Sequence, residues 1–94
     1  MKTISLKEWK AFSQLEKIFY EKLSYEYVLG YMAMNNISNK NNEYFQEYQE
    51  VIRQYYLLCE QLKNEIIIPN VSGADVTWEV NFNEQYVEIR EKAN

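Results

Sequence analysis

The stretch EYFQEYQEVIRQYYLLCEQLKNEI, residues 43–66, decides the fold of this chain. Its large apolar side chains recur at steps of three and four residues, the spacing that lines up side chains along one side of an α-helix. The opposite side is mostly charged or amide-bearing. We therefore predict a helix over about residues 42–64 with one side that must be covered, its seam formed by Phe45, Tyr48, Ile52, Tyr55, Cys59, Leu62 and Ile66.

A second long helix is predicted before it, over about residues 5–34. Ser5 and Glu8 form an S-x-x-E capping box, and Ile4 and Trp9 stand at the two positions of a hydrophobic staple. Residues 35–42 contain five Asn and one Ser, which predicts a short connection and so an antiparallel pair of helices. The predicted buried stripe of the first helix is Trp9, Phe12, Leu15, Phe19, Leu23, Tyr27, Gly30 and Met34.

The C-terminal part predicts a β-hairpin over about residues 76–91, because apolar and polar residues alternate along it. A two-residue loop would place Glu79 opposite Glu88, so we prefer a four-residue loop at 83–86, which places Glu79 opposite Arg90. Residues 66–68 offer a third strand. The predicted fold class is α+β: a long antiparallel helical hairpin with a small C-terminal β-hairpin packed on it, in a single domain spanning 1–94.

Composition argues against an enzyme. The chain has no His, the commonest general base and metal ligand, and only two Gly, too few for a phosphate-binding loop. Its single Cys, Cys59, lies on the predicted seam, where a free Cys is a small apolar side chain. We expect no catalytic, cofactor-binding or metal-binding residues.

The charge is uneven. The chain has a net charge of −4, and residues 65–94 alone carry six acidic and two basic groups. This disfavours a nucleic-acid partner and favours a protein partner with a basic surface. The N-terminus lacks the apolar run of a signal peptide, and no segment is long and apolar enough to span a membrane, so we expect a cytoplasmic protein. Frequent Asn, Ile, Lys and Tyr favour an AT-rich genome, such as that of a phage or a low-GC bacterium.

Tyrosine supplies nine of the fifteen aromatic residues, and it suits binding surfaces because it joins apolar area to a polar tip. Residues 25–34, YEYVLGYMAM, hold one charged side chain in ten and spread apolar groups around the helix. The β-hairpin is expected to cover only one of two apolar patches on the helices, the first at residues 25–34 and the second at Tyr56 and Leu57. The candidate protein-contact residues are Tyr25, Val28, Tyr31, Met32, Tyr56, Leu57, Glu79 and Glu88.

The leading hypothesis is therefore a non-enzymatic protein-binding module. In size, acidity and tyrosine content the chain resembles small stoichiometric inhibitors that occlude a partner, such as immunity or phage anti-defence proteins, and this likeness is an analogy. The alternative is a structural homo-oligomer, such as a homodimer, whose helices complete a bundle. A small enzyme ranks third.

Overall fold

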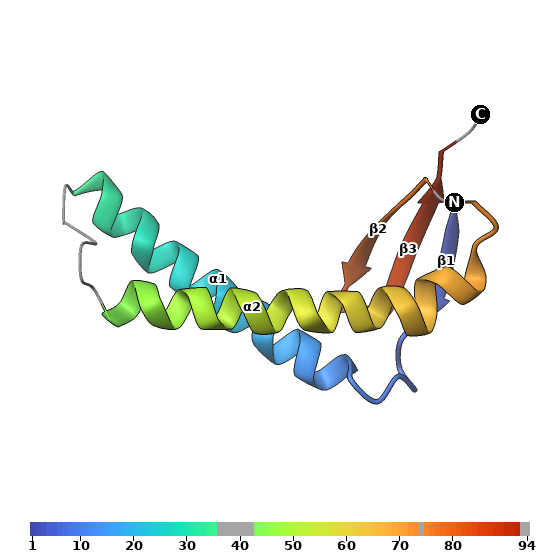
Figure 1. Ribbon diagram of the computed structural model, residues 1–94, viewed down its shortest axis with the longest axis horizontal. Helices are drawn as coiled ribbons and strands as arrows, with labels where there is room; N and C mark the ends of the chain where they lie inside the picture. Colours follow the sequence, from blue (N-terminus) through green and yellow to red (C-terminus); the bar gives the residue numbers. More distant parts are fainter. Residues whose placement is uncertain (36–42, 74, 93–94) are drawn as a thin grey trace.

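The computed structural model describes residues 1–35, 43–73 and 75–92 of the chain. It contains two long helices, α1 (Phe12–Met34) and α2 (Glu43–Leu62), and a three-stranded antiparallel sheet of β1 (Lys2–Ser5), β2 (Val76–Asn81) and β3 (Tyr86–Glu91). The predicted α+β class and helical hairpin are confirmed. Figure 1 shows the two helices crossing, with the sheet beside the C-terminal half of α2. The predicted connection between the helices, at 36–42, lies outside the described residues.

The predicted helix start at Ser5 is wrong. The hydroxyl of Ser5 accepts a hydrogen bond from the Lys7 amide at 3.3 Å, and α1 begins only at Phe12. The residues from Lys2 to Ser5 instead form β1, because they complete the sheet along one edge of β3. Leu6, directly after this strand, is completely buried. The burial of apolar side chains in the tertiary fold therefore outweighs the local preference for a helix cap at Ser5.

The strand order is β1-β3-β2, so β3 lies in the middle although it comes last in the sequence. Its side chains Val87 and Ile89 are buried because both neighbouring strands and the helices surround them. The sequence predicted β2 and β3 as a hairpin but gave no sign of β1. The first strand of the chain consequently lies beside the last one (Figure 1).

The register of the hairpin differs from the predicted one. Glu79 pairs with Glu88 and Thr77 pairs with Arg90, and the connecting turn consists of residues 82–85. The rejected pairing of two carboxylates is tolerated because Arg90, two residues along the same strand, binds Glu88 at 2.6 Å. Gln85 adopts a left-handed conformation with φ of 59°, and its carbonyl accepts the Leu6 amide at 2.8 Å, which ties the turn to the end of β1.

The third strand suggested at residues 66–68 is not present. The chain continues from α2 into a π-helical turn, Lys63–Ile67, and then a 3-10 turn, Ile68–Asn70. Ile67 is completely buried by this path. Pro69 fits the start of the short turn because its missing amide is not needed there.

The two helices face one another along rows that differ from the predicted stripes. On α2, Val51 and Leu58 are buried, while Ile52 and Cys59 of the predicted seam are half-buried at its side. On α1, buried or half-buried residues follow the row Leu15, Ile18, Lys22, Tyr25, Leu29 and Met32. This row keeps a seven-residue period, as expected for two helices packed along their length.

The core lies at one end of the molecule. All buried side chains come from residues 6–18, 51–67 and 87–89 within the described part of the chain. The radius of gyration is 16.1 Å, larger than the roughly 13 Å expected of a compact domain of about 100 residues. The excess arises because the tip of the helical hairpin, residues 25–35 and 43–48, projects beyond the sheet end (Figure 1).

Candidate functional site

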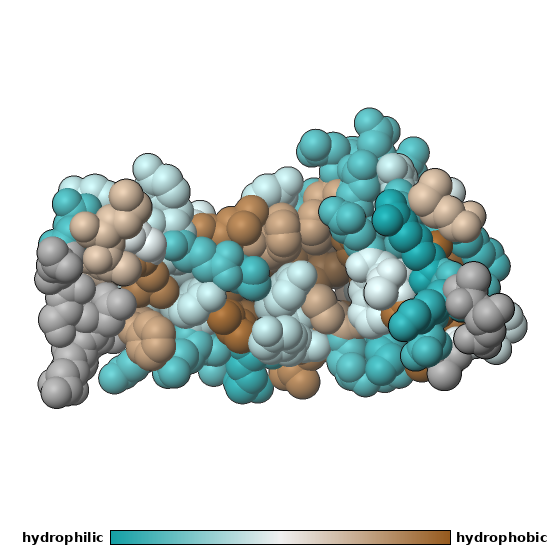
Figure 2. All heavy atoms as spheres, turned by 90° about the horizontal axis from the view of Figure 1, so that it is seen from above, coloured by the Kyte–Doolittle hydropathy of each residue, from teal (hydrophilic) through white to brown (hydrophobic). Residues whose placement is uncertain are grey.

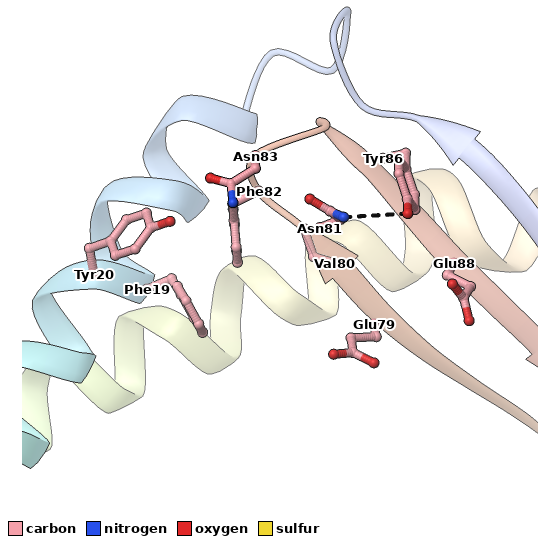
Figure 3. A pocket seen from close by; sticks show the side chains of 9 residues that line it. All are labelled: Phe19, Tyr20, Glu79, Val80, Asn81, Phe82, Asn83, Tyr86 and Glu88. Carbon is pink, nitrogen blue, oxygen red and sulfur yellow. Dashed lines mark hydrogen bonds between the residues drawn. The ribbon is translucent and has the colours of Figure 1, made fainter.

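A groove runs between the N-terminal half of α1 and the exposed side of the sheet. We call it the acidic groove. Its volume is about 340 Å³, and it is open to solvent. Figure 3 shows its lining: aromatic side chains from α1 and the turn on one side, and polar side chains from the strands on the other, namely Phe19, Tyr20, Glu79, Val80, Asn81, Phe82, Asn83, Tyr86 and Glu88.

Strand alternation places the carboxylates of this groove. Val87 and Ile89 point toward the helices, so Glu88 between them points to the opposite face of the sheet, with its partner Glu79 beside it. Glu88 accepts two hydrogen bonds from Arg90, at 2.6 and 2.9 Å. Within the described residues, Glu79 has no hydrogen-bonding or ion-pairing partner. The groove therefore contains one carboxylate whose charge is not neutralised by a neighbouring side chain.

The aromatic wall is built by contacts between α1 and the hairpin turn. Phe82 stacks on Phe19 with their ring centroids 4.5 Å apart, and Tyr20 lies 6.1 Å from Phe82. This cluster attaches the turn to α1 and leaves the ring of Tyr20 about half exposed. A ring face beside a carboxylate is a suitable surface for a Lys or Arg side chain, whose aliphatic stem packs on the ring while its charge meets the carboxylate.

The polar rim of the groove is fixed by the turn. The amide nitrogen Nδ2 of Asn81 donates to the Tyr86 hydroxyl at 3.3 Å (Figure 3), and its Oδ1 accepts the Glu84 amide at 2.9 Å. These bonds hold the last residues of β2 and the first of β3 in place, so the groove is preformed at this end.

A second surface lies on the side of α1 that faces away from α2. Large apolar side chains recur there at steps of three and four residues and are substantially exposed, reaching 80% for Tyr27 and 86% for Met34. We call this set the exposed row: Tyr20, Leu23, Tyr27, Tyr31 and Met34. In the face seen in Figure 2, apolar surface gathers over the middle of the molecule, while hydrophilic residues dominate its sheet end.

The sequence placed most of this row in the buried stripe, which is wrong. Residues four apart are rotated by about 40° around a helix, so a stripe that continues in steps of four drifts away from the contact face. Leu15, Phe19, Leu23 and Tyr27 follow such steps, and the last two have turned to solvent. These repeated steps of four residues are visible in the sequence, and they could have identified the exposed row.

The predicted contact residues of α1 are divided by the fold. Tyr25 packs within the hairpin, with its ring 4.5 Å from Tyr44 and its hydroxyl donating to Glu47 at 3.0 Å. Val28 and Met32 are half-buried, whereas Tyr31 is exposed. We expected β2 and β3 to cover one of the two apolar patches on the helices. They cover neither, because their turn contacts α1 near Phe19 instead.

On α2, the predicted contact residues Tyr56 and Leu57 lie outside the packed row and are 63% and 59% exposed. They are separated from the acidic groove, whose lining includes no residue of α2. The structure thus brings Glu79 and Glu88 together and leaves the helical candidates apart from them.

Cys59 lies half-buried on α2, hydrogen-bonded to the Tyr55 hydroxyl. Burial raises the pKa of the Cys59 thiol, with Tyr55 and Lys22 acting in the opposite direction. Burial also raises the pKa of Tyr55, to about 12. Both groups are therefore protonated near neutral pH, and Cys59 lacks the depressed pKa of a nucleophilic cysteine.

In the described ranges 1–35, 43–73 and 75–92, no three acidic or thiol side chains lie close enough to hold a metal ion. No helix in these ranges has an apolar stretch of the length that a membrane crossing requires. Comparison with protein-family models, curated proteins and solved structures finds no match to this chain.

Proposed function

We propose that this chain is a non-enzymatic cytoplasmic protein-binding module that occludes a basic surface of its partner, in the manner of a small stoichiometric inhibitor. The observation that supports it best is the acidic groove, which is lined by the unpaired carboxylate of Glu79 on one side and by the aromatic side chains of Phe19 and Tyr20 on the other (Figure 3). Such a groove is shaped to accept a Lys or Arg side chain.

The charge distribution supports the same choice of partner. Six of the fourteen acidic residues lie in 65–94, and two of these line the groove. A negative patch of this kind attracts a basic surface over distances of about one Debye length, roughly 8 Å at physiological salt, and accelerates encounter. The groove should therefore affect the association rate more strongly than the dissociation rate.

The test begins with affinity purification from the native host and mass spectrometry, followed by binding kinetics with the purified partner. The double variant Glu79→Gln/Glu88→Gln should associate about tenfold more slowly at low salt. Its matched control is Glu8→Gln/Glu60→Gln, which removes the same charge from exposed positions outside the groove. Equal rates for the two double variants would contradict the proposal.

Homodimer formation is the second candidate, and the exposed row favours it. Five large apolar side chains on one face of α1 form a patch that soluble monomers seldom leave uncovered. In this case Tyr27→Ser/Tyr31→Ser should turn a dimer into a monomer in light scattering, and the groove variants should have no effect on mass. If light scattering shows that the unaltered chain is a monomer at high concentration, the homodimer is ruled out.

A further inference from the structure

The outer edge of β2 offers backbone groups for pairing. In an antiparallel ladder, residues alternate between those bonded to the neighbouring strand and those whose amide and carbonyl point the other way. The Lys92 amide donates to the Asp75 carbonyl at 2.9 Å, which fixes this alternation. Thr77, Glu79 and Asn81 therefore bond to β3. The amide and carbonyl groups of Val76, Trp78 and Val80 point outward, and no described residue pairs with them.

The two edges of the sheet differ in how they are protected. β1 has four residues, and Lys2, its first, donates from Nζ to the Asn70 carbonyl at 2.9 Å. A short strand that begins with a tethered lysine is a poor template for another strand. β2 has six residues, VTWEVN, with one charged side chain and no proline or bulge. Its edge is the open one.

The acidic groove reaches this open edge near the end of β2. Consecutive strand residues point to opposite faces, so a groove on one face would contact every second residue. The lining includes Tyr86 and Glu88 of the central strand β3, on the same face as Glu79 and Asn81, and also Val80, which points to the other face. The groove therefore lies over the exposed face and reaches around the edge of β2 at Val80. Phe19 and Tyr20 of α1 form the opposite wall (Figure 3).

We infer that the β2 edge binds an extended, basic segment of the partner protein, which adds a fourth strand to the sheet. This inference rests on the proposed function and names its mode of binding. Main-chain hydrogen bonds to Trp78 and Val80 hold the segment, as in other cases of strand addition. Its alternate side chains fall on the two faces of the sheet.

The groove determines the chemistry of that segment. Side chains on the outer face lie beside Glu79, whose charge has no partner among the described residues, and so are Lys or Arg. Side chains on the other face lie beside Trp78 and Val80, whose side chains pack against the core, and so are apolar. A second copy of β2 fits less well, because VTWEVN contains no cation and brings its own Glu79.

The test uses a synthetic peptide of alternating lysine and valine, about as long as β2, added to the full chain and followed by nuclear magnetic resonance. Binding should slow hydrogen exchange at the outward amides of Trp78 and Val80. A glutamate–valine peptide of the same length should bind at least about tenfold more weakly. The lysine–valine peptide failing to bind would overturn the inference.

Two modified peptides isolate the backbone contribution without altering the protein. In each of the two peptides every second backbone nitrogen is methylated, and the two peptides differ in which alternating set is modified. Both keep the charge and the side chains of the lysine–valine peptide. One set faces β2, and its methylation should weaken binding about tenfold or more, since several hydrogen bonds are lost. The other set points away and should have little effect. Equal affinities for both would contradict strand addition.

A variant pair tests the same point in the protein. Val80→Pro removes an outward amide from the β2 edge, a position where proline is tolerated, and should abolish peptide binding. Thr3→Pro makes the matched change on the outward side of β1 and should leave binding intact. If a natural partner binds the chain but neither the peptides nor Val80→Pro alter that binding as expected, strand addition fails while the proposed function stands. If no protein partner binds at all, both fail.

Discussion

The sheet end and the tip of the helical hairpin are stabilised in different ways. At the sheet end, Leu6, Leu62, Ile67 and Val87 are completely buried and form one apolar cluster. At the tip, no described side chain is buried, and the two helices are joined by tyrosine–carboxylate hydrogen bonds. The same pair of helices is thus held by apolar burial at one end and by polar contacts at the other.

The difference indicates which part of the chain carries stability. Burial of large apolar side chains contributes most of the free energy of folding, whereas a partly exposed hydrogen bond contributes about 1 kcal/mol. The tip should therefore open more readily than the sheet end. The acidic groove lies on the stable side of this division, since Phe82 of its wall packs on Phe12 of the core.

The largest expected effect separates the two ends of α2. Leu62→Ala removes a completely buried side chain and should lower the free energy of unfolding by about 2–5 kcal/mol. Phe45→Ala, at the other end of the same helix, should cost clearly less than Leu62→Ala because Phe45 is already 38% exposed. Urea unfolding measures both. Similar losses for the two would mean that the tip is as tightly packed as the sheet end.

A smaller effect is expected from the polar contacts of the tip. The Tyr48 hydroxyl donates to Glu26 across the two helices at 2.8 Å. Tyr48→Phe removes this bond with little change in shape and should cost about 1 kcal/mol. Tyr56→Phe is the matched control, since Tyr56 is exposed on the same helix, and it should change stability by less than about 0.5 kcal/mol. A loss at Tyr48 no greater than at Tyr56 would contradict this description of the tip.

The same contact should depend on pH. The hydrogen bond from Lys22 and then that from Tyr48 hold the pKa of Glu26 below its usual value of 4.5, although partial burial opposes them. A carboxyl whose folded-state pKa is lowered contributes stability above its unfolded-state pKa, and loses it as pH falls through the folded-state value. The stability difference between the unaltered chain and Glu26→Gln should therefore be largest near neutral pH and shrink below about 4.5. A constant difference across this range would show that Glu26 acts by shape alone.

At alkaline pH the sign is reversed. Burial, and then the bond to Glu26, raise the pKa of Tyr48 above 10.0. Its neutral form is favoured in the folded state, so its contribution is complete below that value and is lost as pH rises through the raised pKa. Tyr48→Phe should remove this alkaline loss.

The smallest effect concerns the sheet. Glu79 and Glu88 are cross-strand neighbours of like charge, and Arg90 binds only the second of them. Glu79→Gln should therefore raise the free energy of unfolding by about 0.2–1 kcal/mol. Glu60→Gln, at an exposed site on α2, should leave it unchanged. A destabilising Glu79→Gln would show that this carboxylate has a structural role.

Much of the architecture could be predicted because it depends on local periodicity. The spacing over residues 43–66 predicted α2, and the alternation over 76–91 predicted β2 and β3. The prediction was less successful where two interpretations fit the same residues. Ser5 and Glu8 fit a capping box, yet a strand ending at Ser5 forms instead, because Ile4 pairs with Val87 in the sheet.

The candidate site could be predicted only in part. Alternation alone placed Glu79 and Glu88 on the exposed face of the hairpin. The aromatic wall could not be foreseen, because Phe19 and Phe82 are 63 residues apart in the sequence and meet only in the folded chain. The predicted register set Arg90 opposite Glu79, whereas in the folded chain Arg90 neutralises Glu88 from the same strand.

The sequence by itself determined the helices, the hairpin and the acidic character of the C-terminal third, because these follow from the repeat of side chains along a single segment. The tertiary structure alone decided the helix start at Phe12, the third strand and the rows that face each other on α1 and α2. Each of these depends on contacts between segments distant in the chain, where burying Leu6 and Val87 outweighs the preferences of a few neighbouring residues.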